Sequence, residues 1–333
     1  MTPSAFDHFR KPPSGRPAPL PATSASSGGA PVATSSGLFS QVPLVVKERR
    51  AKAILASLDN LPTLPAVAME VIHLSRNANA TASDFEEILR RDQALTARVL
   101  RLVNSPFFGL RSRVTSIPQA IVVLGLRTLR SVVLAAQTSH LLDRQLGPYG
   151  LAEGGMWKHS MACATLTGTV ARGLHLPPDV REEVFVGGLL HDVGKIILAP
   201  HIASAQQEFD GVIGRTRDVV RAETETFGMS HPEVGGKMGR KWGLSATLVE
   251  LIEEHHHPLE PGRTKPGVLV VQVANELCHQ LGVGRKDGPR APGADFAPRV
   301  AALGIAGPID ALLDSARETV AGLEHVFQEL ART

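Results

Sequence analysis

The stretch Val184-Phe185-Val186-Gly187-Gly188-Leu189-Leu190-His191-Asp192-Val193-Gly194-Lys195 decides how this chain folds. An apolar run ends directly in an imidazole and a carboxylate, and unpaired polar groups are costly to bury. Adjacent His and Asp side chains can bind one divalent cation from the same backbone turn. The stretch therefore predicts a buried helix that ends at a metal-type site.

The segments before this stretch read as helices with short loops. After a short helix over Lys47–Leu58, Pro65 suits a helix's first turn, and apolar residues then follow at helical spacing. Ser83 and Glu86 form an expected capping box, and Asp92 is expected to cap the next helix. A long buried helix is predicted over Ala120–Leu142.

The second half has the same character. Helices are expected near 156–173, 179–191, 216–228, 231–241, 245–255 and 266–281. Aromatic residues make up only 4% of the chain, so the core must consist of Leu, Val, Ile and Ala, which favours packed helices over a sheet. The predicted fold class is all-α.

Composition excludes several classes of protein. The net charge of +3 comes without clustered basic residues interleaved with aromatics, so a nucleic-acid partner and a DNA-binding regulator are disfavoured. No run of about 18 apolar residues and no secretory signal occur, so we expect no membrane contact and a cytoplasmic location. Cys163 and Cys278 are expected to be buried thiols, not a disulfide.

Three regions follow from these patterns. Residues 1–45 are rich in Pro, Ser and Gly and are expected to form a disordered tail. Residues 46–285 form the main domain, with an N-terminal helical part over 46–145 and a second helical part over 150–285. Residues 286–333 form a polar linker and an amphipathic helix, whose apolar stripe predicts packing on the domain or, alternatively, a partner or dimer contact.

Further histidines strengthen the metal-site prediction. They lie at helix ends or on apolar faces, where a lone imidazole would more often be a satisfied core residue. Five of them in one half of a chain with only 13 His favour a shared site, formed by His159, His191, His231, His255 and His256 together with Asp192.

With these residues in place, the second half resembles the HD superfamily of metal-dependent phosphohydrolases, and its additional histidines resemble those of HD-GYP enzymes. The first half resembles the HDOD family closely. The motifs occur in order as Leu61-Pro62-Thr63-Leu64-Pro65, Asp92-Gln93-Ala94-Leu95-Thr96, Leu100-Arg101-Leu102-Val103-Asn104-Ser105 and Ala120-Ile121-Val122-Val123-Leu124-Gly125. The resemblance covers about residues 55 to 285 and implies an HDOD-type helical bundle with an HD-like subdomain, used in bacterial signalling.

The resemblance also implies roles for the site residues. His159, His191 and Asp192 would be metal ligands, with Asp192 bridging two ions, and the second ion would be completed by His231, His255 and His256. Lys195 would lie beside a substrate phosphate as a point charge. If the site is active, Asp192 and Lys195 carry phosphoester hydrolysis with one or two ions of Fe, Mn or Zn.

Two departures from the HD pattern weaken that chemistry. The position of the closing aspartate is taken by Asn275, which offers no charge, and Glu276 points about 100° away on the same helix. The Gly-Tyr-Pro segment of HD-GYP enzymes is missing, the only tyrosine is Tyr149, and Gly155 supplies no carboxylate one turn before the first histidine. Metal binding is expected to be weak, and a cyclic di-GMP phosphodiesterase is disfavoured.

The simpler interpretations apply to the remaining candidates. Trp157 and Trp242 are expected to be core anchors and His257 a solvated extra, while His201 and His279 receive no role. Asn104-Ser105-Pro106 stops a helix, and its resemblance to the HDOD motif implies a specific packing or capping role.

Two functions follow. The first is a regulatory signal-transduction module that acts by protein–protein interaction, with a partly retained metal pocket and a signalling partner such as a sensor kinase or a cyclic-nucleotide turnover protein. It rests on Asn275 and the missing Gly-Tyr-Pro segment and favours a non-enzyme. The alternative is a metal-dependent phosphohydrolase acting on a nucleotide or cyclic nucleotide, which rests on the six intact candidate ligands.

Overall fold

The computed structural model describes residues 42–60, 64–75, 81–104, 108, 110–142, 146–324 and 327. Within these ranges every regular element is a helix, and Leu151 and Arg285 form an isolated antiparallel bridge. The all-α prediction is confirmed. Most of the expected N-terminal tail and the motif residues 61–63 lie outside the described residues.

Six helices form the first part of the fold. They are α1 (Leu44–Ser57), α2 (Ala66–Ser75), α3 (Ala82–Arg90), α4 (Gln93–Val103), α5 (Ile117–Leu124) and α6 (Leu126–Leu142), with a short 3-10 turn, η2 (Leu58–Asn60), after the first. Asp92 caps α4 as predicted, its Oδ1 accepting the backbone N–H of Leu95 at 2.8 Å.

Two sequence predictions in this part were wrong. The capping box of α3 is formed by Thr81 and Asp84, two residues earlier than Ser83 and Glu86, because the helix begins at Ala82. The long helix expected over 120–142 is broken at Gly125, whose φ of +80° interrupts the helical path between α5 and α6.

Asn104 has the specific capping task that its motif implied. It lies at the end of α4, and its side-chain amide donates to the carbonyls of Leu100 and Val114, both at 2.7 Å. Its Oδ1 accepts the N–H of Val114 at 2.7 Å. One amide thus closes the helix end and fastens the chain ten residues further on.

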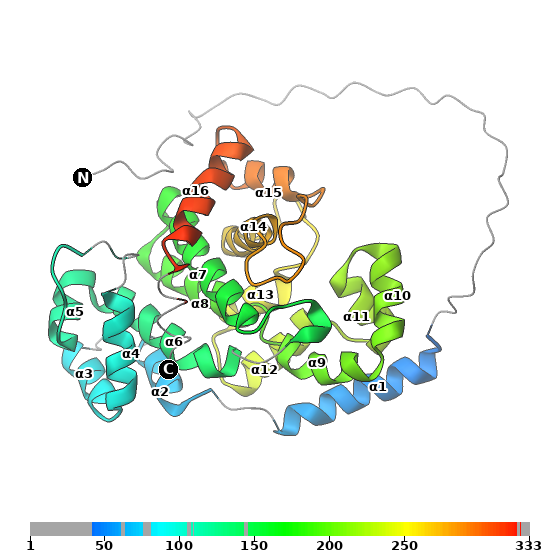
Figure 1. Cartoon of the computed structure of the whole chain (residues 1–333), viewed down its shortest axis with the longest axis horizontal. Helices are drawn as coiled ribbons and strands as arrows, with labels where there is room; N and C mark the ends of the chain where they lie inside the picture. Colours follow the sequence, from blue (N-terminus) through cyan, green and yellow to red (C-terminus); the bar gives the residue numbers. More distant parts are fainter. Residues whose placement is uncertain are drawn as a thin grey trace.

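The centre of the molecule is built by α7 (Gly155–Gly173), α8 (Pro178–Leu190) and α14 (Pro266–Gln280), which pack on one another (Figure 1). Around them lie α9 (Lys195–Ser204), α10 (Gln206–Thr216), α11 (Val219–Phe227), α12 (His231–Lys241) and α13 (Ala246–Glu254), with the turn η4 (Gly147–Tyr149) before α7. The sequence missed α9 and α10. One hydrophobic core runs through both halves, from Ile54 to Phe327.

The first and last described helices both cover the second half. α1 packs against α9 and α11, and Arg50 pairs with Glu208 at 2.8 Å (Figure 1). After α15 (Phe296–Ala302), α16 (Ile309–Ala321) packs against α7, with Leu312 and Ala316 buried. The ring of Phe327 meets Trp157 edge-on at 5.4 Å, so this part of the apolar stripe packs on the core. Leu330 lies outside the described residues.

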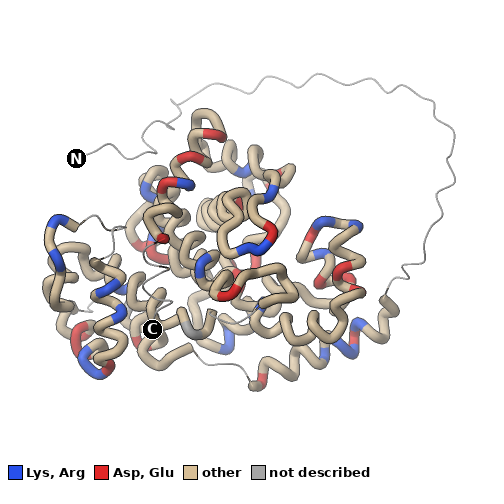
Figure 2. Tube along the Cα trace, in the orientation of Figure 1, with Lys and Arg blue, Asp and Glu red and all other residues tan. Residues whose placement is uncertain are grey.

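Charge and hydropathy agree with the composition. Charges of both signs are spread over most helices in Figure 2. Between Asp92 and Asp143, however, all six charged residues are arginines. Among the described helices none has both the length and the apolar character needed to cross a membrane.

Candidate metal centre

The site begins where α8 ends. The apolar face of this helix is buried, and the turn His191–Gly194 follows it into the interior. Gly194 makes this placement possible, because a Cβ atom there would overlap the carbonyl oxygen of His231 at the start of α12. The absence of a side chain lets the two backbones meet and brings the second half's histidines to Asp192.

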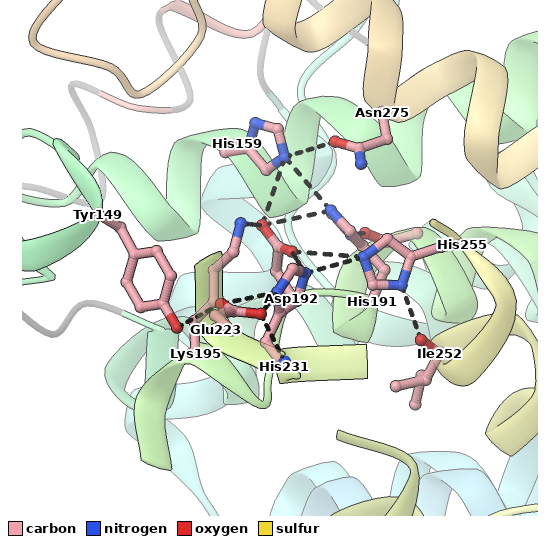
Figure 3. Close-up of polar contacts among 11 residues, drawn as sticks. Tyr149, His159, His191, Asp192, Lys195, Glu223, His231, Ile252, His255 and Asn275 are labelled. Atoms are coloured by element: carbon pink, nitrogen blue, oxygen red, sulfur yellow. Dashed lines mark hydrogen bonds and ion pairs between the residues drawn. The ribbon is translucent and has the colours of Figure 1, made fainter. Parts of the chain in front are cut away.

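Asp192 lies at the centre of four imidazoles (Figure 3). Its Oδ2 is 3.4 Å from Nε2 of His191 and 3.7 Å from Nε2 of His159. Its Oδ1 is 3.2 Å from Nε2 of His231 and 3.6 Å from Nε2 of His255. Each carboxylate oxygen therefore faces its own pair of histidines, the arrangement expected of a carboxylate shared by two cation positions.

Backbone and side-chain partners orient three of these rings. Nδ1 of His191 donates to the carbonyl of Gly188 at 2.8 Å, and Nδ1 of His255 donates to that of Ile252 at 2.7 Å. Nδ1 of His231 donates to Glu223 at 2.8 Å. Because Nδ1 carries a hydrogen in each ring, Nε2 is the nitrogen that faces Asp192 and the one that would bind a metal.

His256 joins the second group of possible ligands. One nitrogen or oxygen each from Asp192, His231, His255 and His256 lies within 4.8 Å of all the others, as is also true of the set His159, His191 and Asp192. Nε2 of His256 is buried without a hydrogen-bond partner. The structure therefore brings together all six residues that the sequence proposed as ligands.

Asn275 occupies the closing position of the site. It is 3% exposed, and its Oδ1 lies 3.0 Å from Nε2 of His159. Glu276 does not replace the missing charge, because its carboxylate turns outward and accepts the backbone N–H of Gly293 at 2.7 Å. The first group is thus one carboxylate short of a full set.

Glu223 is the residue that sequence reasoning missed. It is fully buried in α11 and accepts three hydrogen bonds, from the Tyr149 hydroxyl at 2.7 Å and from both the backbone N–H and Nδ1 of His231 at 2.8 Å (Figure 3). A carboxylate behind a histidine fixes its tautomer and raises its basicity. A glutamate in a helix directly before a helix that begins with a histidine was the available signal.

The protonation of the site follows from burial and from Asp192. Burial lowers the pKa of His159 and of His255 to about 3, so both rings are neutral. Burial opposes a charge on His191 as well, but the nearby Asp192 carboxylate outweighs it and raises the pKa of His191 to about 10. Burial alone would raise the pKa of Asp192, yet His191 and Lys195 hold it well below its usual range.

The residues fit a bound cation. Asp192 Oδ1 has no hydrogen-bond donor among the described residues, although two imidazole nitrogens stand close to it. Imidazole nitrogens and a carboxylate therefore converge here, which is the donor set that a divalent transition metal requires, and metal binding would release the protons held by such rings.

A cavity of about 680 Å³ adjoins this cluster. His159, Asp192 and Lys195 line it at the metal end, where Lys195 Nζ donates to Asp192 Oδ2 at 2.6 Å and lies 5.4 Å from the centre of the Tyr149 ring. His279 also lines it, with its ring 5.0 Å from that of His159, a location for which the sequence gave no indication.

The remaining candidates lie where the simpler interpretations placed them. Trp157 and Trp242 are buried, and the side chain of His257 is 54% exposed. His201 lies away from the cluster, where its Nε2 is hydrogen-bonded to the Ser57 hydroxyl with a separation of 3.1 Å. Cys163 and Cys278 are both buried free thiols.

Fold and site together define a helical domain of the HD type, with histidines and one central aspartate arranged for metal binding. The profile of the HDOD domain matches residues 61–258, more than half of the chain. The chain belongs to the HDOD family.

Relatives and solved structures agree with this assignment. An uncharacterized protein of Treponema pallidum is 25% identical over 235 residues, which is 68% of this chain and 43% of the relative. Ribonuclease Y of Thermotoga maritima is 29% identical over 119 residues, 36% of this chain and 17% of that enzyme. The chain thus spans less than half the length of these relatives.

The fold has a close counterpart in an HDOD domain protein of unknown function from Geobacter sulfurreducens. The two superpose with a TM-score of 0.67 at 23% identity, covering 85% of this chain and 99% of the other. A Shewanella amazonensis protein provisionally named a metal-dependent phosphohydrolase gives 0.57 at 19% identity, over 84% of this chain and 100% of the other. At these identities the likeness concerns the fold.

Proposed function

We propose that this chain is a regulatory HDOD module whose histidine pocket binds a divalent transition metal and whose output is a protein–protein interaction. The observation that carries the proposal is Asn275. An otherwise assembled ligand set is closed by a neutral amide beside His159, which supports binding but removes charge from the place where a hydrolase would need it.

His159, His191 and Asp192 would hold one ion, and His231, His255 and His256 would complete a second around the same aspartate. When bound, such an ion acts as a Lewis acid toward a phosphate oxygen. The chain's own residues position Asp192 through Lys195 and orient His231 through Glu223. The partner we infer is a signalling protein, such as a sensor kinase or a cyclic-nucleotide turnover protein, in the cytoplasm.

The second candidate is a metal-dependent phosphohydrolase acting on a nucleotide or cyclic nucleotide. A specific observation favours it, namely that Lys195 and Asp192 face a cavity of about 680 Å³, a volume suited to a small organic ligand. A lysine ammonium there would pair with a phosphate as a point charge.

Metal content and turnover separate the two. The purified chain is loaded with Mn²⁺, Fe²⁺ or Zn²⁺, desalted and analysed for metal, with His191→Ala as the test variant and His257→Ala as the matched control. We expect retained metal in the parent and the control and loss in His191→Ala. Equal metal in all three would contradict the metal site.

Turnover of bis-p-nitrophenyl phosphate is measured on the same loaded samples. The regulatory proposal expects a rate no higher than that of His191→Ala. A rate that depends on His191 but not on His257 would replace it with the phosphohydrolase candidate.

A further inference from the structure

A second wall of the cavity carries positively charged side chains, in contrast to the histidines and the carboxylate of the metal site. Arg285 lines it with a side chain that is only 5% exposed, and its Nη2 donates to Asp287 at 2.7 Å. Its Nε is buried and has no acceptor among the described residues. A buried guanidinium with an unused donor can bind a further acceptor, and an anion in the cavity would supply one.

Arg290 brings a second guanidinium to this wall. It lines the same cavity, and partial burial together with the neighbouring charge of Arg285 lowers its pKa. Its backbone N–H donates to the carbonyl of His279 at 3.0 Å. His279 in turn contacts His159, and its Nδ1 is buried without a partner, so this histidine lies between the arginine wall and the metal ligands.

The two ends of the cavity share the wall Tyr149-Gly150. Lys195 lies over the Tyr149 ring, while a Cβ atom on Gly150 would stand 3.7 Å from Nη2 of Arg285. The lysine at the metal end and the arginine at the other end therefore lie beside consecutive residues of one wall of the same cavity.

We infer that the cavity binds a small phosphorylated molecule, whose phosphate is held by Arg285 and Arg290 while the rest of the molecule extends toward Lys195 and Asp192. Guanidinium groups match phosphate oxygens in bidentate geometry, and two of them suit a dianion better than a single carboxylate. Asp287, whose side chain is 68% exposed, is ion-paired with Arg285, and the phosphate would displace it from this pair.

Only the metal end of this inference rests on the proposed function. The probe is inorganic phosphate, titrated by calorimetry into the full chain after its metal has been removed with EDTA, and again into the metal-loaded chain. Acetate serves as the second probe, because it is an oxyanion like phosphate but carries a single negative charge.

Three variants give opposed expectations. Arg290→Gln weakens phosphate binding to the metal-free chain about fivefold to tenfold, the size of one charged contact. Asp287→Asn strengthens it about threefold, because Arg285 loses its internal competitor. Arg113→Gln, an exposed arginine absent from this cavity's lining, leaves it unchanged. Acetate binds more weakly than phosphate throughout.

Several results would overturn the inference. Phosphate binding that is equal in Arg290→Gln and Arg113→Gln, or that exists only in the metal-loaded chain, places the anion on the metal and not on the arginines. Acetate binding as tightly as phosphate would contradict a site that prefers a doubly charged anion. A chain that binds phosphate through Arg290 but retains no metal would support the arginine site and refute the metal proposal, so the two failures are distinguishable.

Discussion

Asn275 presents its side-chain oxygen 3.0 Å from Nε2 of His159, in the place where a carboxylate would complete the ligand set. The position is 3% exposed, so an anion from solvent cannot readily reach it to supply the missing charge. The neutral amide of Asn275 is thus part of an otherwise assembled ligand set.

Asn275→Asp is expected to strengthen metal binding by at least about tenfold, the effect that even an indirect partner of a ligand commonly has. It should also destabilise the metal-free chain, because a second buried carboxylate then lies near Asp192. Competition with a metal-sensitive dye and thermal melts with and without Mn²⁺ measure the two effects. Glu276→Asp is the matched control, and an equal gain in both variants would contradict the role of Asn275.

Glu223→Gln should weaken metal binding about 10- to 100-fold, since the carboxylate fixes the Nδ1–H tautomer of His231. Tyr149→Phe removes only the hydroxyl that donates to Glu223 and should have a smaller effect of the same sign. Metal titration of both variants gives the comparison. A Glu223→Gln chain with the parent's affinity would show that Glu223 has no part in the site.

The stability of the metal-free chain should fall as the pH drops. His159 and His255 have pKa values near 3 in the folded chain and about 6.5 when unfolded, so below pH 6.5 the unfolded state takes up protons that the folded state refuses. The contribution of these two neutral histidines to stability is therefore present above pH 6.5 and is lost progressively as the pH falls toward 3.

His191 acts with the opposite sign, because its folded pKa of about 10 is above its unfolded value. Its contribution is complete below pH 6.5 and is lost as the pH rises toward 10. Urea unfolding of the metal-free chain at pH 5, 6.5 and 9 should show a maximum at the middle value. In His159→Gln the loss between pH 6.5 and pH 5 should shrink, and an unchanged loss would count against a buried neutral His159.

Gly194→Ala is expected to destabilise the chain by about 1–3 kcal/mol and to lower metal binding, because the new methyl group overlaps the carbonyl of His231. A Cβ atom on Gly214 in α10 would have no neighbouring atom within 4 Å, so Gly214→Ala should leave the stability of the chain unchanged or raise it slightly. Urea unfolding and metal content compare the pair. Equal behaviour of the two variants would mean that the approach at Gly194 is unimportant.

Much of this site could be predicted from the sequence, because its chemistry lies in local patterns. His191-Asp192 ends an apolar run, and the other histidines sit at helix starts or ends, as the structure shows for His231 and His255. The fold class followed similarly from helical spacing of apolar residues.

The parts that the sequence did not reveal depend on tertiary packing. Glu223 carries no motif and becomes recognisable only when α11 turns it toward His231. The break at Gly125 depends on one residue's positive φ inside an otherwise helical pattern. The arginine wall arises because Arg285, at the predicted end of the domain, and residues 286–290, predicted to be polar linker, fold back onto the turn before α7.

That return of the chain has a mechanical consequence. Gly155 and Gly284 meet backbone to backbone without room for a side chain on either, and Ala152 donates its N–H to the carbonyl of Gly284 at 3.0 Å. The beginning of α7, which carries His159, is thereby fastened to the segment that follows α14, which carries Asn275. The same loop lines the cavity, so a ligand in the cavity and a molecule bound to the outer face of the loop would both act on this backbone contact. If one of them changes the affinity of the other, linkage requires that the effect be reciprocal and equal in size.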